Sequence, residues 1–212
     1  RCFPAWFVNP RPMTWIAAGF SLCMLVYAAF VLRSTWAFMR IPCEPPQVSA
    51  LPPLVSVVIP ARNEAAHLSR CLRSVLDQSY PPSRYEVILV NDHSTDATKA
   101  IAYLLAQQHS QLHIVDLELS HPTVAYKKAA LAAGIDAAQG EFILQTDADC
   151  EVGHRWIECM VSHLGPNTGL VAGPVLLTHS GHWLQRLQAL ELMGLVVLGG
   201  GSMARRRPNM AN

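Results

Sequence analysis

The amino-acid sequence predicts an α/β domain with a mostly parallel sheet and helices on both of its faces, preceded by one membrane-spanning helix. Two observations favour the domain. Apolar runs rich in β-branched residues alternate with segments of helical periodicity, and three of these runs end in polar clusters. A third observation favours the membrane helix, because twenty consecutive residues near the N-terminus carry no charge. A chain of 212 residues has room for both.

The composition excludes several classes of protein. The net charge is +1 and charged residues make up 15% of the chain, so we expect no nucleic-acid partner. The six cysteines include no C-x-x-C pair, which argues against a zinc site or a disulfide scaffold. The chain begins with Arg1 rather than Met and stops at Asn212 without a closing element, so we expect a fragment of a longer protein.

The uncharged run extends from Met13 to Leu32, between Arg11 and Arg33. As a helix it would span about 30 Å, which matches the hydrocarbon core of a bilayer. The run is long for a signal peptide, and no small-residue cleavage site follows it before a cluster of prolines. We therefore predict a membrane helix.

The predicted organisation has four parts. Residues 1–12 form an N-terminal flank, 13–32 the membrane helix, and 33–53 a proline-rich extended linker. Residues 54–212 form the α/β domain, incomplete at its C-terminus.

In the first half of the domain, predicted strands alternate with predicted helices. Residues 54–59 are rich in valine and isoleucine and predict a buried parallel strand that Pro60 ends. Apolar residues at helical spacing then predict a helix over 64–77, which Pro81 stops. A second strand is expected at 87–90.

The remaining elements follow from the same patterns. The sequence predicts further strands over 113–117, 141–146 and 170–172, and further helices over 97–108, 124–138, 155–164 and 182–198. The last helix is apolar, and both a position at the membrane interface and packing on the domain are consistent with its sequence. The glycines at 199–201 predict a flexible turn.

Polar clusters follow three of the predicted strands, at residues 61–64, 91–96 and 147–149. Parallel strands place their carboxyl ends along one edge of a sheet, where open α/β folds bind ligands. Strand alternation sends Asp147 and Asp149 to the same side. Two carboxylates on one side suit Mg²⁺ or Mn²⁺ shared with a phosphate. The alternative is that one of these aspartates caps the next helix or loop.

Four segments carry a resemblance to a known family. They are Val57-Val58-Ile59-Pro60-Ala61-Arg62-Asn63-Glu64, Val90-Asn91-Asp92-His93-Ser94-Thr95-Asp96, Lys127-Lys128-Ala129-Ala130-Leu131 with Gly134, and Gly140-Glu141 through Asp147-Ala148-Asp149. In this order and spacing, they make residues 54–212 resemble family 2 glycosyltransferases of the GT-A fold.

The resemblance implies a set of binding residues. It assigns nucleotide-sugar binding to Pro60, Arg62, Asn63, Glu64, Asp92, Lys127 and Asp147, and the metal, Mg²⁺ or Mn²⁺, to Asp149 and Asp147. Asp92 would accept a hydrogen bond from the uracil N–H.

Alternatives remain open for several of these residues. Asp92 could instead close an Asx-turn, and Glu64 could favour the positive end of its helix. Lys128 could replace Lys127, or both could be solvated. We expect Asp96 to cap the following helix.

The function implied by the resemblance is inverting, metal-dependent transfer of a hexosyl or N-acetylhexosaminyl group. The donor would be a nucleotide sugar, with UDP expected, and the acceptor a lipid or polysaccharide. We expect an enzyme of the cell inner membrane, with its catalytic domain in the cytoplasm and its general base beyond Asn212.

Three other functions are consistent with parts of the pattern. A catalytically idle membrane partner could bind a nucleotide without transferring a sugar. A phosphohydrolase of the haloacid dehalogenase type also has D-x-D after a strand, but on the first strand of its domain. A nucleotidyltransferase would have a Gly- and Arg-rich loop after its first strand, which residues 61–64 do not provide.

Overall fold

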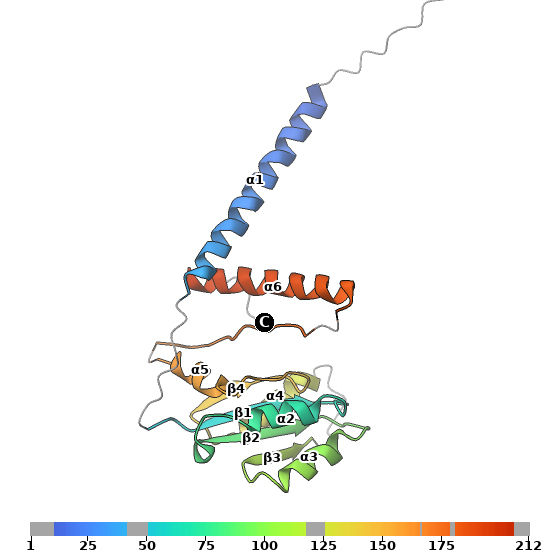
Figure 1. Ribbon diagram of the computed structural model, residues 1–212, viewed down its shortest axis with the longest axis vertical. Helices are drawn as coiled ribbons and strands as arrows, with labels where there is room; N and C mark the ends of the chain where they lie inside the picture. Colours follow the sequence, from blue (N-terminus) through green and yellow to red (C-terminus); the bar gives the residue numbers. More distant parts are fainter. Residues whose placement is uncertain (1–10, 42–50, 118–125, 166, 179–180, 206–212) are drawn as a thin grey trace, which may run out of the picture. The chain divides into compact units, whose positions relative to one another are not determined.

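The computed structural model describes residues 11–41, 51–117, 126–165, 167–178 and 181–205. The chain divides into two compact units, Arg1–Glu44 with Gly173–Asn212, and Pro45–Ala172. The second unit contains the sheet, and the first contains two long helices (Figure 1).

A four-stranded parallel sheet forms the centre of the second unit. Its strands are β1 (Val55–Ala61), β2 (Tyr85–Asn91), β3 (Leu112–Asp116) and β4 (Phe142–Gln145), in the order β3-β2-β1-β4. Six of the seven residues of β1 and all seven of β2 are buried, as expected for inner strands covered on both faces. The predicted parallel sheet is therefore confirmed.

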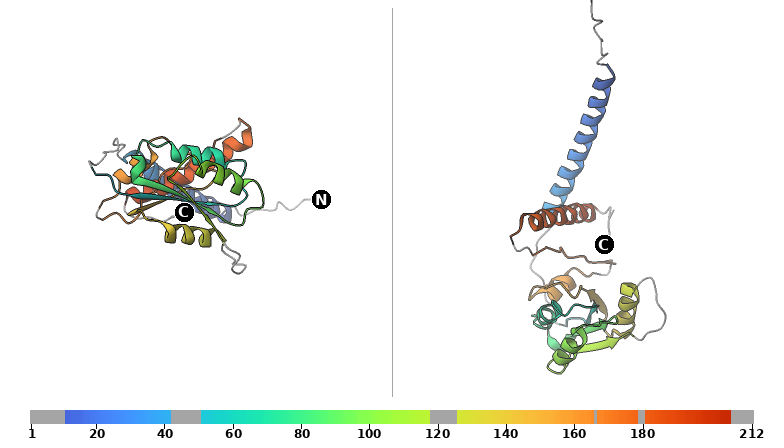
Figure 2. Two further views of the ribbon diagram at one scale, coloured as in Figure 1. Left: turned by 90° about the horizontal axis from the view of Figure 1, so that it is seen from below. Right: turned by 90° about the vertical axis from the view of Figure 1, so that its right-hand side faces the viewer.

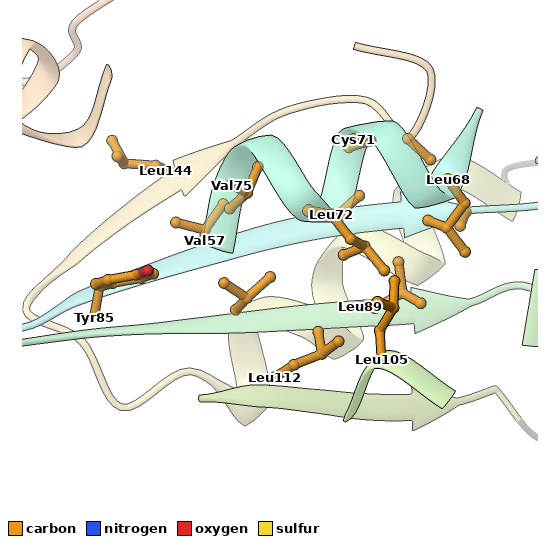
Figure 3. Close-up of a cluster of buried hydrophobic side chains, with 14 of the residues drawn as sticks. Val57, Leu68, Cys71, Leu72, Val75, Tyr85, Leu89, Leu105, Leu112 and Leu144 are labelled. Carbon is orange, nitrogen blue, oxygen red and sulfur yellow. The ribbon is translucent and has the colours of Figure 1, made fainter. Parts of the chain in front are cut away.

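Helices cover both faces of the sheet, as predicted (Figure 2). One face carries α2 (Leu68–Leu76), α3 (Thr98–Ala106) and α5 (Trp156–Ser162), and the other carries α4 (Tyr126–Ala137). On the first face, Leu72 and Val75 of α2 pack in one buried cluster with Val57 and Leu89 of the sheet (Figure 3). A single turn of 3-10 helix, Pro82–Arg84, precedes β2.

Two glycines allow close packing around β1. A Cβ atom on Gly134 of α4 would lie 2.4 Å from Val58 Cγ1, and one on Gly140 would lie 2.4 Å from the Ser56 backbone nitrogen. Any larger side chain at Gly140 would therefore have to displace the backbone of β1.

Several predicted boundaries were wrong. β1 continues through Pro60 to Ala61, because it pairs with β2 along its whole length while its pairing with β4 has already ended at Val58. The helix expected from residue 64 begins at Leu68, because a turn that bonds His67 and Leu68 N–H to Glu64 C=O precedes it. The strand expected at 170–172 is absent. These residues are irregular, and Leu170 is 71% exposed with no neighbouring strand to pair with.

The first unit contains α1 (Arg11–Met39) and α6 (Trp183–Ala204). Both predicted helices are confirmed, but both run further than expected. Residues 33–39 of the predicted linker are helical, and the turn expected at 199–201 is also helical. Within this unit, a Cβ on Gly201 would lie 2.2 Å from Ser34 C=O, so the glycines let the two helix backbones approach.

The helices α1 and α6 have the properties of candidate membrane spans. Thr14–Met39 and Trp183–Ala204 are long and apolar enough to cross a bilayer, judged by length and composition. Their apolar side chains are exposed, Phe20 by 66% and Leu190 by 66%.

Candidate functional site

The carboxyl ends of β1, β2 and β4 meet the start of α4 around a cavity of about 310 Å³. Its polar lining consists of Arg62, Glu64, Asp92, Tyr126, Lys127, Asp147 and Asp149, with Pro60, Ala61, Ala130 and Ala148 as apolar neighbours. Three polar clusters that are far apart in the sequence therefore border one space, as the sheet-edge argument predicts.

The parallel register explains how the first two clusters come together. Ala61 at the end of β1 pairs with Asn91 at the end of β2, and the Asp92 N–H donates to Ala61 C=O at 2.9 Å. The next residues, Arg62 and Asp92, are therefore neighbours across the strands. Arg62 Nη1 lies 3.7 Å from Asp92 Oδ2.

The aspartate pair lies beyond the end of β4 at Gln145, so the alternation expected of a strand does not govern it. Asp147 and Asp149 both line the cavity. Ala148 between them also borders it, but is only 3% exposed and packs in the apolar core. The Cys150 N–H donates to Asp147 C=O at 3.1 Å and closes a tight turn. The two carboxylates therefore face the same space from a constrained loop.

Lys127 in the first turn of α4 forms an ion pair with Asp147, with 2.8 Å between Nζ and Oδ1. Both side chains are exposed, Lys127 more than Asp147. Lys128 is exposed and lies outside the cavity lining. The geometry therefore favours Lys127 over its neighbour as the lysine of the site.

Asp92 is the most buried carboxylate of the cavity, with 5% of its side chain exposed. The turn after β2 is closed by Asn91, whose Oδ1 accepts from the Ser94 N–H at 3.3 Å. His93 Nδ1 contacts Asp92 Oδ1 at 2.7 Å. The side-chain bond that closes this turn is thus made by Asn91, and Asp92 lines the cavity.

Tyr126 is a cavity residue that the sequence reasoning missed. The Arg62 guanidinium carbon lies 4.5 Å from the centre of the Tyr126 ring, a cation–π contact. Tyr126 is 40% exposed. The available signal was an aromatic residue directly before Lys127, at a position that the matched motif does not include.

Asn63 is the one predicted binding residue outside the cavity lining. It has a left-handed backbone, with a φ of 56°, and its Oδ1 accepts from the Thr95 N–H at 2.8 Å. Asp96 accepts from Ala65 N–H at 3.1 Å and from Thr98 N–H at 2.9 Å, and its pKa is lowered mainly by the Thr98 hydrogen bonds. Asn63 and Asp96 therefore tie the loop after β1 to the loop after β2. The N-cap residue of α3 is Ala97, and Asp96 one residue earlier accepts from the N–H of Thr98, the first residue of the helix.

Two cysteine thiols lie beside the aspartate pair. Cys71 Sγ donates to Asp147 C=O at 3.5 Å, and burial, aided by Cys150 and Asp149, raises its pKa to about 12. Burial and the neighbouring Asp149 also raise the pKa of Cys150. Both sulfurs are therefore neutral thiols at neutral pH.

The carboxylates could hold only part of a coordination shell. No group of three His, Cys, Asp or Glu side chains suited to a metal ion occurs in the residues that the structure describes. Mg²⁺ and Mn²⁺ commonly take one or two carboxylates, with water and substrate phosphates as the other ligands. Asp147 and Asp149 fit that pattern.

Residues 56–206 match the family model "Glycosyl transferase family 2". The chain belongs to glycosyl transferase family 2. The matched segment contains every residue of the cavity lining and most of the described sheet unit. The α/β architecture predicted for a GT-A glycosyltransferase is the one that the structure shows.

Individual glycosyltransferases show the same likeness. The chain is 35% identical over 128 residues to Glycosyltransferase AglE of Haloferax volcanii, covering 60% of this chain and 41% of the relative. It is 31% identical over 183 residues to an N-acetylglucosaminyltransferase of Rhizobium meliloti, covering 82% of this chain and 42% of the relative. The chain thus spans about two fifths of the length of these relatives.

A solved structure agrees with the fold. Mannosyltransferase PcManGT from Pyrobaculum calidifontis, in complex with GDP-Man and Mn²⁺, superposes with a TM-score of 0.53 at 27% identity. The match covers 70% of this chain and 44% of the mannosyltransferase.

Proposed function

We propose that the cavity binds the nucleoside diphosphate of a sugar donor, and that the protein transfers the sugar with inversion to a lipid or polysaccharide acceptor. One observation carries the proposal. A buried hydrogen-bond acceptor, Asp92, and a charged group of Lys127, Asp147 and Asp149 border the same cavity at two separate strand ends. A nucleoside diphosphate needs recognition of this kind at its base and at its phosphates.

The spacing of the strands suits such a ligand. In the order β2-β1-β4, the strands that lead to Asp92 and Asp147 are two strand spacings apart, about 10 Å. The base and the diphosphate of a nucleotide are likewise separated by a ribose. Asp92 accepts the base N–H, and Pro60, Arg62 and Glu64 contact the nucleoside between the two ends. Asn63 supports this contact by holding its loop.

UDP is the nucleotide that the family resemblance favours. The mannosyltransferase complex contains GDP-Man, and guanine also offers a ring N–H beside a carbonyl group. Asp92 could accept a hydrogen bond from either base. Both nucleotides therefore belong in the test.

At the diphosphate, Lys127 is the positively charged donor. It bonds Asp147 at 2.8 Å, and a phosphate oxygen would compete for the same ammonium group. Asp147 and Asp149 would hold Mg²⁺ or Mn²⁺, which is consistent with the Mn²⁺ of the mannosyltransferase complex. A bound divalent ion would offset the negative charge that develops on the leaving diphosphate.

The candidate membrane helices support the proposed acceptor and location. A membrane span at α1 would hold the enzyme at a bilayer, where lipid-linked or growing polysaccharide acceptors are found. We propose that the enzyme resides in the cell inner membrane with the sugar-transfer domain in the cytoplasm, the location of nucleotide sugars. A hexosyl or N-acetylhexosaminyl group is proposed as the sugar, consistent with the Rhizobium relative.

The test is calorimetric titration of the full chain, in detergent, with UDP and with GDP in the presence of Mn²⁺. We expect one of the two to bind, and we expect Asp92→Asn to weaken binding at least about tenfold through loss of a charged acceptor. Failure of a folded chain to bind either nucleotide would overturn the proposed donor site.

A further inference from the structure

The loop that carries the aspartate pair leaves the sheet before the pair begins. Backbone pairing of β4 with β1 ends at Gln145, opposite Val58, and α5 starts only at Trp156. Residues 146–155, the aspartate loop, have no regular secondary structure. A further backbone bond reaches the sheet, from the Thr146 N–H to the Val58 C=O at 3.4 Å. The course of the loop beyond Thr146 therefore depends on contacts outside the sheet.

Helix α2 supplies the first of these contacts. Cys71 Sγ donates to the Asp147 C=O at 3.5 Å, at the start of the aspartate loop. Ser74 Oγ accepts from the Val152 N–H at 3.1 Å, near the middle of the loop. Ser74 also donates to the Cys71 C=O at 2.8 Å, which fixes the direction in which its oxygen accepts. Cys71 and Ser74 are three residues apart and thus lie on the same face of the helix.

Gln78, which follows the end of α2 at Leu76, holds the far end of the aspartate loop. Its Nε2 donates to the Gly153 C=O at 2.9 Å, and its Oε1 accepts from the Ile157 N–H of α5 at 3.0 Å. Nε2 also donates to the Ser74 C=O at 2.8 Å, so the amide is anchored to α2 itself. Gln78 is only 8% exposed, and its bonds therefore have little competition from water.

We propose that Ser74 and Gln78 are positioning residues for the aspartate loop, and that through Asp147 and Asp149 they set the affinity of the site for Mg²⁺ or Mn²⁺. The inference rests on the proposed function, because it concerns the same donor site. Neither Ser74 nor Gln78 lines the cavity, so both act through the loop. Residues that hold metal ligands in place by hydrogen bonds typically account for about 10- to 100-fold in metal affinity.

A role in positioning differs from a role in stability. Ala148 and Val152 of the loop also pack against the apolar core, so the loop stays docked without the hydrogen bonds. Apolar packing has no preferred direction, whereas a hydrogen bond restricts both distance and angle. Loss of these bonds would therefore let the two carboxylates shift. Because Mg²⁺ demands near-octahedral coordination, such a shift weakens metal binding even in a folded chain.

Single substitutions remove these bonds with little change in side-chain volume. Ser74→Ala removes the acceptor of the Val152 N–H, and Gln78→Leu removes the amide that bonds Gly153 and Ile157. Ser74→Thr keeps a hydroxyl at the same position and serves as the conservative replacement.

Two controls separate the aspartate loop from the rest of the chain. Ser162 of α5 donates to the Cys159 C=O at 2.9 Å, the same helical bond that Ser74 makes to Cys71, but Ser162 is exposed. Ser162→Ala therefore removes an equivalent hydroxyl that does not hold the loop. Leu105→Ala removes core packing from α3 and should destabilise the chain at least as much as the loop variants, while the bonds to the loop remain.

The experiment measures metal binding directly and stability in parallel. The full chain and the five variants, in detergent, are titrated with Mn²⁺ in the presence of UDP and of GDP, and electron paramagnetic resonance reports the free Mn²⁺. Chemical denaturation gives the free energy of unfolding of each variant. We expect Ser74→Ala and Gln78→Leu to raise the Mn²⁺ concentration at half-saturation about tenfold. Ser74→Thr, Ser162→Ala and Leu105→Ala should stay within about twofold of the unmodified chain.

Each contrary outcome has a distinct meaning. Half-saturation of Ser74→Ala and Gln78→Leu at the same Mn²⁺ concentration as the unmodified chain would overturn the positioning role but leave the proposed function intact. An equal loss in Leu105→Ala would also overturn it, since metal affinity would then follow stability. Absence of Mn²⁺ binding by the unmodified chain with either nucleotide would remove the proposed donor site, and the positioning role with it.

Discussion

Lys127 Nζ, at the start of α4, lies 2.8 Å from Oδ1 of Asp147, which follows β4. The two residues are 66% and 47% exposed, so water screens their attraction. Exposed ion pairs contribute at most about 1 kcal/mol to stability. Because the contact stabilises the fold so little, Lys127 can be replaced to test the proposed ligand role without a large loss of stability.

The first prediction concerns this lysine. Lys127→Met should change the free energy of unfolding by less than about 1 kcal/mol but weaken UDP or GDP binding about tenfold, because a charged donor to the diphosphate is lost. Lys128→Met is the matched control, since Lys128 is the exposed neighbour outside the cavity lining. Equal losses in the two variants, measured by calorimetry, would contradict the assignment.

Removal of the metal provides the second prediction. Nucleotide binding by the full chain should fall by at least about tenfold when EDTA replaces Mn²⁺. In Asp149→Asn, binding should already be weak, and EDTA should change it little. The exposed Asp136 of α4 lies outside the cavity lining, and Asp136→Asn should behave like the unmodified chain. An Asp149→Asn variant that keeps its full response to Mn²⁺ would exclude this carboxylate as a ligand.

The third prediction concerns packing at Gly140. Gly140→Ala should lower the free energy of unfolding by about 1–3 kcal/mol, because its Cβ would lie 2.4 Å from the backbone nitrogen of Ser56. Gly153→Ala is the control, since a Cβ there meets no atom within 4 Å. Chemical denaturation of both variants measures the difference. Equal stabilities would show that β1 shifts at little cost.

The fourth prediction concerns alkaline pH. The pKa of Cys71 is raised by burial from its ordinary value of 9.0 to about 12 in the folded chain. Because the pKa is raised in the folded chain, the contribution of the neutral Cys71 thiol to the free energy of unfolding is complete below pH 9. It is lost as the pH rises toward 12. Between pH 8 and pH 10.5 this thiol should account for a loss of about 2 kcal/mol.

The comparison with Cys71→Ala isolates that loss. Burial also raises the pKa of Tyr80 and Tyr85, so the variant should still lose stability in alkali, but less steeply. Denaturation curves at these two pH values give the slope of the free energy of unfolding against pH for the variant and for the unmodified chain. Identical slopes for the variant and the unmodified chain would show that Cys71 ionises as freely when folded as when unfolded.

Much of the sheet unit was predictable because its strands are covered on both faces. Runs such as Val87-Ile88-Leu89-Val90 are apolar throughout, which suits an inner parallel strand. The boundaries were less predictable. The start of α2 depends on Ala65 N–H and Glu64 N–H bonding to Asp96 and Thr98, side chains about thirty residues away.

The candidate site was predictable where a local rule governed it. The parallel register requires Arg62 and Asp92 to be neighbours. Asp147 and Asp149 lie beyond the end of β4 at Gln145, so the turn closed by Cys150 N–H and Asp147 C=O, rather than strand alternation, sets their directions. The choice between Lys127 and Lys128 follows no such rule, because adjacent helical residues point in different directions and the packing of α4 selects between them.

The sequence by itself determined the apolar elements, their alternation and the polar residues at the strand ends, since these depend on neighbours in the chain. Only the tertiary structure decided which side chains share the cavity, including Tyr126, and that the glycines at 199–201 are helical. Glycine is compatible with both a turn and a helix. In this chain the helical form is supported by the close approach of Gly201 to Ser34, a contact between residues 167 positions apart (201 − 34) that no local pattern specifies.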